Sequence, residues 1–333
     1  MNILGIESTC DETGVAVVEN GTKVLSSALA TSVFEQAKYG GIVPEIAARE
    51  QLKVIIPTLN NVLKSVPVGT IDAVAVSYGP GLIGSLLVGV ETAKSLASAW
   101  NKPLIPVNHL SAHIYSNWID EKIPPKFPLV GLVISGGHTD LVYMKKHGDF
   151  KLIGSTLDDA AGEAFDKVAR FLGLPYPGGP QIEKRAKMFS GIKSNVTFPR
   201  SMLASKDLNF SFSGIKTAVV QFVEKHEVKL TDDAVCEISF QFEQAIVDSI
   251  VVKVKRAIGE YKANALVVGG GVSANTRLRE RLRGLGVEGH VKVHFPKKEF
   301  SVDNGAMIAS AAFFTGRRHN PLSIQAESGL HFS

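Results

Sequence analysis

Residues 103–113 read Pro-Leu-Ile-Pro-Val-Asn-His-Leu-Ser-Ala-His. The apolar run 103–107 is typical of a short buried strand, and the residues after it have the pattern of a helix. His109 and His113 are one helical turn apart, so their imidazoles lie on one face, close enough to share a divalent ion. Because paired histidines are more often surface or core residues, a metal site needs a third ligand.

This stretch ends a first series of predicted strands and helices. Three β-rich segments come first, and polar turns separate them: 2–8, 14–19 and 23–29. The turn between the first two is Thr9-Cys10-Asp11-Glu12-Thr13. A helix, a strand, a further helix and a last strand are expected next, over 44–64, 71–76, the residues up to about 100, and 103–107. The predicted order is βββαβαβ.

The same order returns later in the chain, which indicates an internal duplication. Its predicted elements are strands at 129–134, 139–143 and 150–155, a helix at 159–172, a strand at 265–268, a helix to about 283, and a strand at 291–295. Residues 175–262 interrupt this copy as an insertion, loop-like through 211–214 and helical from about 234 to 261. We expect an α/β protein with two similar lobes across a cleft, made of 1–108 plus 304–333 and of 109–303.

Composition sets further limits. Apolar residues make up 45% and charged residues 20% of the 333 positions, with a net charge of +4, which is typical of a globular protein. Two cysteines, Cys10 and Cys236, cannot form a disulfide framework, which favours a reducing cytoplasm. The most apolar long stretch, 82–100, contains Glu91 and Lys94, so we predict a packed helix there and no membrane span.

The duplication predicts the third metal ligand. Asp303 follows the last strand of the second copy, as the histidines follow the last strand of the first. A pseudo-twofold relation between the lobes would bring Asp303 opposite His109 and His113. Two imidazoles and one carboxylate suit Fe(II), with Zn(II) as second choice, and leave positions open for substrate. The alternative is that Asp303 only caps a helix over 304–316.

Glycine-rich loops suggest a nucleotide. Ser135-Gly136-Gly137 is a tight turn whose backbone N–H groups could face a phosphate or an oxyanion. The run 269–271 precedes a helix, as nucleotide loops often do, but neither loop has the GxxxxGK[ST] or GxGxxG pattern. Basic residues cluster in the second copy, at Lys184, Arg185, Lys187, Arg277, Arg279, Arg281, Arg283, Lys297 and Lys298. Such runs are usually solvated helix faces, yet they leave room for an RNA partner.

Several longer motifs together resemble the bacterial TsaD family of tRNA threonylcarbamoyladenosine transferases. They are Gly5-Ile6-Glu7-Ser8-Thr9-Cys10-Asp11-Glu12-Thr13, Gly40-Gly41-Ile42-Val43-Pro44-Glu45, Gly79-Pro80-Gly81-Leu82, Asn108-His109-Leu110-Ser111-Ala112-His113, Ser135-Gly136-Gly137-His138-Thr139, Asp158-Asp159-Ala160-Ala161-Gly162-Glu163-Ala164-Phe165-Asp166-Lys167, Gly178-Gly179-Pro180, Ser211-Phe212-Ser213-Gly214-Ile215-Lys216-Thr217 and Asp303-Asn304-Gly305-Ala306. The resemblance extends over essentially the whole chain.

The resemblance implies a two-lobed fold like that of actin, sugar kinases and chaperone ATPases, with duplicated RNase H-like domains. It implies transfer of the threonylcarbamoyl group from threonylcarbamoyl-AMP to the exocyclic amine of the adenosine beside the anticodon, in tRNAs that read codons beginning with A. One Fe(II) would be held by His109, His113 and Asp303. The substrate-binding residues would be Val133, Ile134, Ser135, Gly136, Gly137, Asp166, Gly179, Glu183 and Asn275. Implied partners are a non-catalytic paralogue, TsaB, and a small ATPase, TsaE.

The chain also departs from the family pattern. Archaeal and eukaryotic relatives place a tyrosine ligand just before the Ser-Gly-Gly turn, where this chain has the apolar Val133. Many relatives have a histidine where this chain has Gln51, which puts a titrating role there in doubt. Asp11 and Glu12 are the candidates for the general base, against the alternative that they only shape the turn.

Three other functions stay open at this level. A metalloprotease is disfavoured because His-Leu-Ser-Ala-His lacks the glutamate of HExxH. A small-molecule kinase or carbamoyltransferase of the same fold would act without tRNA. A non-catalytic scaffold would not need three metal ligands.

Overall fold

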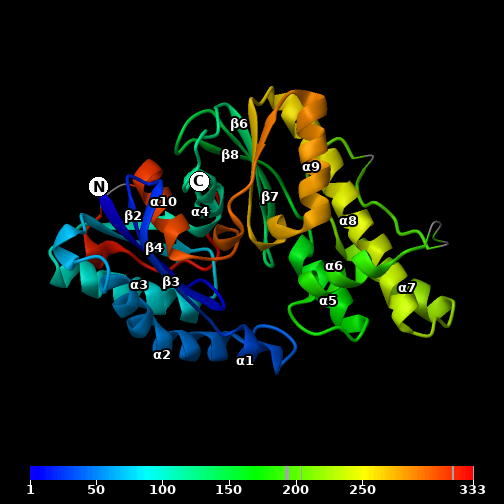
Figure 1. Cartoon of the computed structure of the whole chain (residues 1–333), viewed down its shortest axis with the longest axis horizontal. Helices are drawn as coiled ribbons and strands as arrows, with labels where there is room; N and C mark the ends of the chain where they lie inside the picture. Colours follow the sequence, from blue (N-terminus) through cyan, green and yellow to red (C-terminus); the bar gives the residue numbers. More distant parts are fainter. Residues whose placement is uncertain (192–193, 195, 204, 317–318, 333) are drawn as a thin grey trace. The chain divides into compact units, whose positions relative to one another are not determined.

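The computed structural model describes residues 1–191, 194, 196–203, 205–316 and 319–332 (Figure 1). The chain forms two compact units: Met1–Pro125 with Lys146–Phe150 and Phe295–Ser333, and Lys126–Lys145 with Lys151–His294. The predicted lobe boundaries, after 108 and before 304, stay a prediction. In these units His109, His113 and Asp303 all belong to the first.

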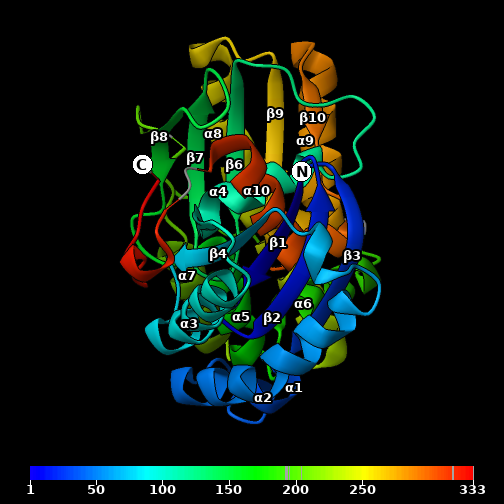
Figure 2. The same ribbon diagram turned by 90° about the vertical axis from the view of Figure 1, so that its left-hand side faces the viewer.

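The first unit is built on a mixed sheet with the order β3-β2-β1-β4-β5. Its strands are β1 (Asn2–Glu7), β2 (Glu12–Glu19), β3 (Lys23–Thr31), β4 (Ala73–Gly79) and β5 (Leu104–Asn108). The first three, which correspond to the predicted β-rich segments, form an antiparallel meander, and β4 runs parallel to both β1 and β5. Figure 2 shows β1, β2 and β4 side by side. β2 begins at Glu12, so the prediction that the turn extends to Thr13 was wrong.

Helices cover both faces of this sheet. They are α1 (Val33–Ala37), α2 (Pro44–Leu63), α3 (Ile83–Ala99), α4 (His109–Tyr115) and α10 (Gly305–Thr315). Side chains alternate along a strand, so Leu4 and Ile6 of β1 face the core under α2 and α3. Gly5 between them faces α10, whose backbone at Gly305 leaves no room for a Cβ atom at residue 5.

The second unit repeats this arrangement with the sheet order β10-β9-β6-β7-β8. Its strands are β6 (Leu129–Ile134), β7 (Thr139–Met144), β8 (Phe150–Ser155), β9 (Ala265–Gly269) and β10 (Lys292–His294). In both sheets the first strand of the copy is central, with the meander on one side and the two parallel strands on the other. The predicted duplication is therefore confirmed.

The helices of the second unit are α5 (Ala161–Phe171), α6 (Gly178–Met188), α7 (Ser213–Lys225), α8 (Asp232–Tyr261) and α9 (Thr276–Gly289). The insertion is more helical than expected, because α6 was not predicted and α7 begins at Ser213, inside the expected loop. The Asp158 carboxylate explains this start, since it accepts hydrogen bonds from the backbone N–H of Phe212 and Ser213 at 2.8 and 3.2 Å. Short 3-10 helices occupy Val68–Thr70, Ser116–Trp118, Gly271–Ala274, Lys298–Phe300 and Pro321–Ser323.

Among the residues that the structure describes, no helix is both long and apolar enough to cross a membrane.

Candidate metal centre and substrate loops

The metal-binding helix α4 begins where β5 ends because Asn108 caps it. The Asn108 Oδ1 accepts hydrogen bonds from the backbone N–H of Leu110 and Ser111 at 2.9 and 3.3 Å. His109 is therefore the first helical residue, and His113 lies one turn further on the same face. Their ring centroids are 4.6 Å apart with an edge-to-face geometry.

Asp303 meets both histidines. Its Oδ1 lies 3.2 Å from the His113 Nε2 and 3.6 Å from the His109 Nε2. The alternative that Asp303 caps the following helix is wrong, because Asn304 does so: its Oδ1 accepts from the backbone N–H of Met307 at 2.9 Å. The predicted meeting of two histidines and one aspartate is confirmed.

The three side chains fit one divalent ion. Ligand atoms held 2.0–2.2 Å from one ion at tetrahedral or right angles lie about 2.8–3.6 Å apart, as the Asp303 contacts do. His113 is fully buried, and neither of its ring nitrogens makes a hydrogen bond of regular geometry among the described residues, although the Nε2 lies 3.2 Å from the Asp303 Oδ1. A buried nitrogen without a partner costs free energy, and a bound ion would remove that cost.

A carboxylate behind His109 sets the orientation of its ring. Glu7, at the end of β1, is fully buried, and its Oε2 lies 3.0 Å from the His109 Nδ1. The other carboxylate oxygen accepts from the backbone N–H of Thr9 at 2.7 Å. With its proton on Nδ1, a neutral His109 directs the Nε2 lone pair toward Asp303 and His113, as metal-binding histidines do.

The same carboxylates change the proton affinity of His109. Burial lowers the pKa of the ring, but the Glu7 and Asp303 carboxylates outweigh this and raise the pKa of His109 to about 9. An ion that binds at the Nε2 must therefore displace a proton at neutral pH, and this couples metal affinity to pH.

Glu7→Gln should weaken metal binding by about 10–100-fold, as loss of the partner of a metal ligand usually does. The amide can still accept from Thr9, but its NH₂ group then faces the His109 Nδ1 and favours the tautomer protonated on Nε2. Metal titration of both proteins measures the change. Glu19→Gln, at the exposed end of β2, is the matched control and should bind metal normally. Equal affinities in all three proteins would contradict the role given to Glu7.

The turn that bears Asp11 and Glu12 is held by Gln51 of α2. The Gln51 Nε2 donates toward the backbone oxygens of Ser8, Cys10 and Glu12 at 3.2, 2.9 and 3.2 Å. Gln51 is thus a buried donor that shapes the turn. Burial, reinforced by the Asp11, Asp303 and Glu7 carboxylates, raises the pKa of Glu12 well above its ordinary value of 4.5.

In the second unit, Ser135-Gly136-Gly137 forms the expected tight turn between β6 and β7. The backbone N–H of Ser135 donates to the oxygen of His138 at 2.9 Å, and the Ser135 Oγ accepts from the N–H of His138 at 3.2 Å. A Cβ atom at Gly136 or Gly137 would have no protein atom within 4 Å, so the turn is open to a ligand. Val133 and Ile134 are fully buried at the end of β6, so neither their side chains nor their backbone atoms are exposed.

The other predicted nucleotide residues form two groups in this unit. The Asp166 Oδ1 accepts from the backbone N–H of Gly178 at 2.7 Å and fixes the start of α6 beside Gly179. The Glu183 Oε1 accepts from the Thr276 hydroxyl at 2.6 Å, and its Oε2 lies 3.5 Å from the Asn275 Nδ2. Glu183 and Asn275 are therefore neighbours, as a shared ligand would require.

Asn275 is fixed from behind by a buried carboxylate. The Glu243 Oε1 accepts from the Asn275 Nδ2 at 2.7 Å, and its Oε2 accepts from the Arg277 Nε at 2.8 Å. The Asn275 Oδ1 caps α9 by accepting from the backbone N–H of Leu278. These contacts leave the Asn275 amide one orientation.

Most residues of the basic cluster have acidic or backbone partners within the protein. Arg185, Lys187, Arg277, Arg281 and Lys297 form ion pairs with Asp232, Glu183, Glu243, Asp248 and Asp120. The Arg279 Nε donates to the backbone oxygen of Ser273 at 2.6 Å. These residues therefore cannot be counted as free phosphate contacts, and the solvated-face alternative describes them better.

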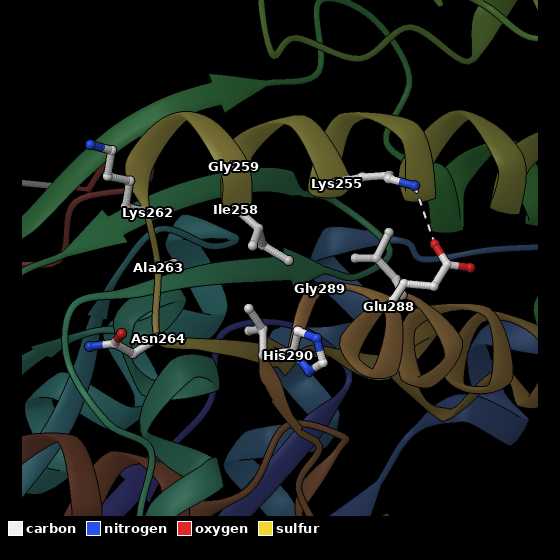
Figure 3. A pocket seen from close by; sticks show the side chains of 11 residues that line it. Lys255, Ile258, Gly259, Lys262, Ala263, Asn264, Glu288, Gly289 and His290 are labelled. Atoms are coloured by element: carbon white, nitrogen blue, oxygen red, sulfur yellow. Dashed lines mark hydrogen bonds and ion pairs between the residues drawn. The ribbon is translucent and has the colours of Figure 1, made fainter.

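A cavity of about 550 Å³ in the second unit (Figure 3) is lined by none of the residues of the loops 135–137 and 269–271. Lys262 and His290 lie beside it, at the C-terminal ends of α8 and α9, and Lys255 forms an ion pair with Glu288 at its rim. These helix ends precede β9 and β10, so the cavity lies at the amino ends of these strands. Ligands of α/β proteins bind at the carboxyl ends, so we do not assign the substrate to this cavity.

Several functional residues were missed from the sequence. Glu7 and Glu243 could have been noticed as acidic residues inside otherwise apolar segments, since buried carboxylates usually have a partner. Asn304 carries the signature of a helix cap directly after Asp303. Gln51 was noticed only as a departure from the family pattern, and its role as a donor had no signal because its acceptors are about 40 residues away in the chain.

A family model described as "TsaD: tRNA N6-adenosine threonylcarbamoyltransferase" matches residues 23–310. The chain belongs to the TsaD family. A transferase of this name from Carboxydothermus hydrogenoformans is 47% identical, over 98% of this chain and 97% of its own length. The one from Symbiobacterium thermophilum is 48% identical, over 98% and 96%. The TsaD-family chain is thus a tRNA N6-adenosine threonylcarbamoyltransferase, an enzyme that forms threonylcarbamoyladenosine in tRNA.

Solved structures similar to this TsaD-family chain support its fold. HypF from T. kodakarensis has a TM-score of 0.63 at 13% identity, over 94% of this chain and 47% of that one. Component A of (R)-2-hydroxyglutaryl-CoA dehydratase from Acidaminococcus fermentans has a TM-score of 0.53 at 14% identity, over 94% and 98%. The expected fold class, that of actin-like ATPases, is confirmed.

Proposed function

We propose that this enzyme uses threonylcarbamoyl-AMP as donor and modifies N6 of the adenosine 3′ to the anticodon, in tRNAs that read codons beginning with A. The N6 amine would attack the carbamoyl carbon, the bond from this carbon to the phosphate oxygen would break, and AMP and one proton would leave. The observation that supports this chemistry best is the fully buried His113, whose nitrogens lack hydrogen-bond partners in the described chain while Asp303 lies 3.2 Å away.

His109, His113 and Asp303 would hold one Fe(II), with Zn(II) as second choice, since two imidazoles and a carboxylate leave open positions on either ion. The bound ion would supply Lewis acidity and a template for the reacting groups. Glu7 keeps the His109 Nε2 available by holding the ring at Nδ1.

The backbone N–H groups of Ser135, Gly136 and Gly137 would stabilise negative charge that develops during transfer. Support comes from the open space at both glycines, which lets a substrate approach the backbone. One such donor is typically worth about 3 kcal/mol of the barrier. Val133 and Ile134, at the buried end of β6, would hold the Ser-Gly-Gly turn in place at the substrate site.

Asp166, Gly179, Glu183 and Asn275 would hold the nucleotide part of the donor. An acidic side chain such as Glu183 can accept hydrogen bonds from ribose hydroxyls. The contacts among Glu183, Asn275 and Thr276 support a preorganised subsite, because its side chains need no rearrangement before they bind.

Glu12 or Asp11 would accept the proton of the attacking amine. A raised pKa makes Glu12 a stronger base once it has lost its own proton. Glu12→Gln should lower kcat by about 10²–10⁴-fold if Glu12 is the base, and metal titration should show unchanged affinity. Glu35→Gln, on α1, serves as the control. Full transfer activity of the Glu12 variant would dismiss Glu12 from this role.

We propose that the enzyme works in the cytoplasm with a non-catalytic paralogue, TsaB, and a small ATPase, TsaE. The first unit offers an apolar surface that suits a protein partner. Leu52 and Ile56 of α2 and Ile83 and Leu87 of α3 are 64%, 49%, 51% and 45% exposed. Exposed groups of large apolar side chains often mark interaction sites.

Incubation of the protein with threonylcarbamoyl-AMP and unmodified tRNA tests the proposal. The reaction is run with the protein alone and with each partner, and the nucleosides are then analysed by mass spectrometry. We expect threonylcarbamoyladenosine in tRNA that carries the target adenosine, and none in tRNA with guanosine there. If no combination gives the product, the proposal is wrong.

A further inference from the structure

We propose that residues 327–332, the C-terminal strap, fix the position of the metal-binding helix α4. The strap acts through Asn108 and the loop Gly79-Pro80-Gly81, so Asn108 and Gly79 are positioning residues of the metal centre. This inference rests on the proposal that His109, His113 and Asp303 hold an ion.

Asn108 connects the strap to the first turn of α4. Its side-chain oxygen caps the helix, while its Nδ2 donates to the backbone oxygen of His331 at 2.9 Å. The Ser111 hydroxyl donates back to the Asn108 backbone oxygen at 2.7 Å. The Asn108 side chain thus joins residue 331 to the first turn of α4. A shift of the strap would therefore tilt the turn that bears His109.

The loop after β4 makes the second connection. The Glu327 N–H donates to the backbone oxygen of Tyr78 at 2.8 Å, and the Gly81 N–H donates to that of Ser328 at 3.4 Å. Gly79 pairs with Asn108 across β4 and β5. A Cβ atom at Gly79 would collide with the Glu327 oxygen, so the strap is in direct backbone contact with the end of β4, and it meets the end of β5 through the Asn108 side chain.

This loop also reaches the carboxylate that orients His109. The Leu82 N–H donates to the backbone oxygen of Thr9 at 2.9 Å, and a Cβ at Gly81 would lie 2.8 Å from the Thr9 Cβ. Thr9 in turn donates its N–H to Glu7, and its Oγ1 lies 3.4 Å from the His109 Nδ1. The strap is therefore connected to His109 in two ways: through α4, which bears this histidine, and through Glu7, the hydrogen-bond partner of its ring.

The strap is anchored firmly at its start and loosely along its length. Ile324, just before it, is buried in the core of the first unit. Further along, Phe332 meets Phe150 with ring centroids 5.6 Å apart, and a cavity of about 480 Å³ opens among Phe332, Ser111 and Thr315. Because the strap is not packed on all sides, its few hydrogen bonds determine where it lies.

Asn108→Asp separates the strap from the helix cap. Aspartate caps a helix as well as asparagine does, but it cannot donate to the His331 oxygen. The substitution also adds a negative charge, so a second variant that adds no charge tests the strap independently. We expect metal affinity to fall about 10–100-fold, as for other partners of metal ligands.

Gly79→Ala displaces the strap by collision and leaves the three metal-binding side chains and Glu7 chemically unchanged. Gly329→Ala is the matched control, because it adds the same methyl group to the strap at a place with no atom within 4 Å. We expect Gly79→Ala to lose at least tenfold in metal affinity and Gly329→Ala to bind as the wild type does.

Anaerobic Fe(II) titration and Zn(II) competition with a chelating dye measure affinity, and thermal unfolding without metal checks that each variant is folded. If the wild type binds no better than His113→Ala, the proposed metal centre fails. If the wild type binds and both Asn108→Asp and Gly79→Ala bind equally well, the strap inference alone is overturned. Should Gly79→Ala fail to fold, Asn108→Asp decides.

Discussion

His113→Ala is expected to abolish specific metal binding and to lower the transfer rate by about 10³-fold, since Lewis acidity is worth several kcal/mol in such reactions. Loss of a metal-binding side chain should weaken metal binding by at least about 100-fold. Loss of a group that is only hydrogen-bonded to such a side chain already weakens binding by about 10–100-fold.

Thermal unfolding shows the effect without any activity measurement. With free metal at 100 times the wild-type Kd, binding stabilises the folded protein by about 2.7 kcal/mol. A 100-fold weaker variant would gain only about 0.4 kcal/mol at the same concentration. Without metal, the free energies of unfolding of the two proteins should differ by less than is usual when a buried histidine is truncated. The reason is that the buried nitrogens of His113 make no hydrogen bonds of regular geometry in the described chain.

His226→Ala is the matched control, since His226 is an exposed histidine that could bind metal only nonspecifically. It should keep both the metal-induced stabilisation and the transfer activity. A His113→Ala protein that is stabilised by metal as strongly as the wild type would contradict the assignment of the centre.

The order of strands and helices could be predicted because it depends on local patterns. Apolar strands such as β4 and β6 are buried on both faces of their sheets, and the turns that follow such strands contain glycine or polar residues. The repeat of one order in two places then predicted two similar α/β units, as the equivalent sheet orders confirm, while the actin-like fold class was implied by the family resemblance. α6 was not predicted, and its N-terminal Gly178-Gly179-Pro180 consists of residues that are typical of turns.

The metal centre was predictable in part. The spacing of His109 and His113 is a local feature, and the duplication pointed to Asp303. The helix-cap alternative could be excluded only with coordinates, which show Asn304 in that role. Glu7 contacts a residue 102 positions away, and such a pairing has no signature in a single sequence.

The basic residues show where a prediction from the sequence claims too much. Counted along the chain, Arg277 and Arg281 belong to a positive run that could face RNA. In the fold their partners are Glu243 and Asp248 of α8, more than 30 residues earlier in the chain. Charge runs therefore overstate the surface that is available to a phosphate backbone.

Gly162→Ala should lower kcat and kcat/KM together, by about 10²–10³-fold, and leave metal affinity unchanged. The N–H of Gly162 donates to the Ser135 oxygen at 3.2 Å, so the start of α5 rests on the Ser-Gly-Gly turn. An alanine Cβ would lie 2.5 Å from this oxygen and 2.8 Å from the Gly136 Cα. Both are backbone atoms and cannot rotate away, so the turn must move.

Displacement of the turn removes N–H donors from the developing charge, and loss of one such donor typically costs 10²–10³ in kcat. A contact made only in the transition state lowers both kinetic parameters equally. Gly284→Ala on α9, where a Cβ meets no atom within 4 Å, is the control and should keep full activity. A folded Gly162→Ala enzyme with wild-type kcat would remove the turn from catalysis, and a parallel loss of metal affinity would show that the substitution acts beyond the turn.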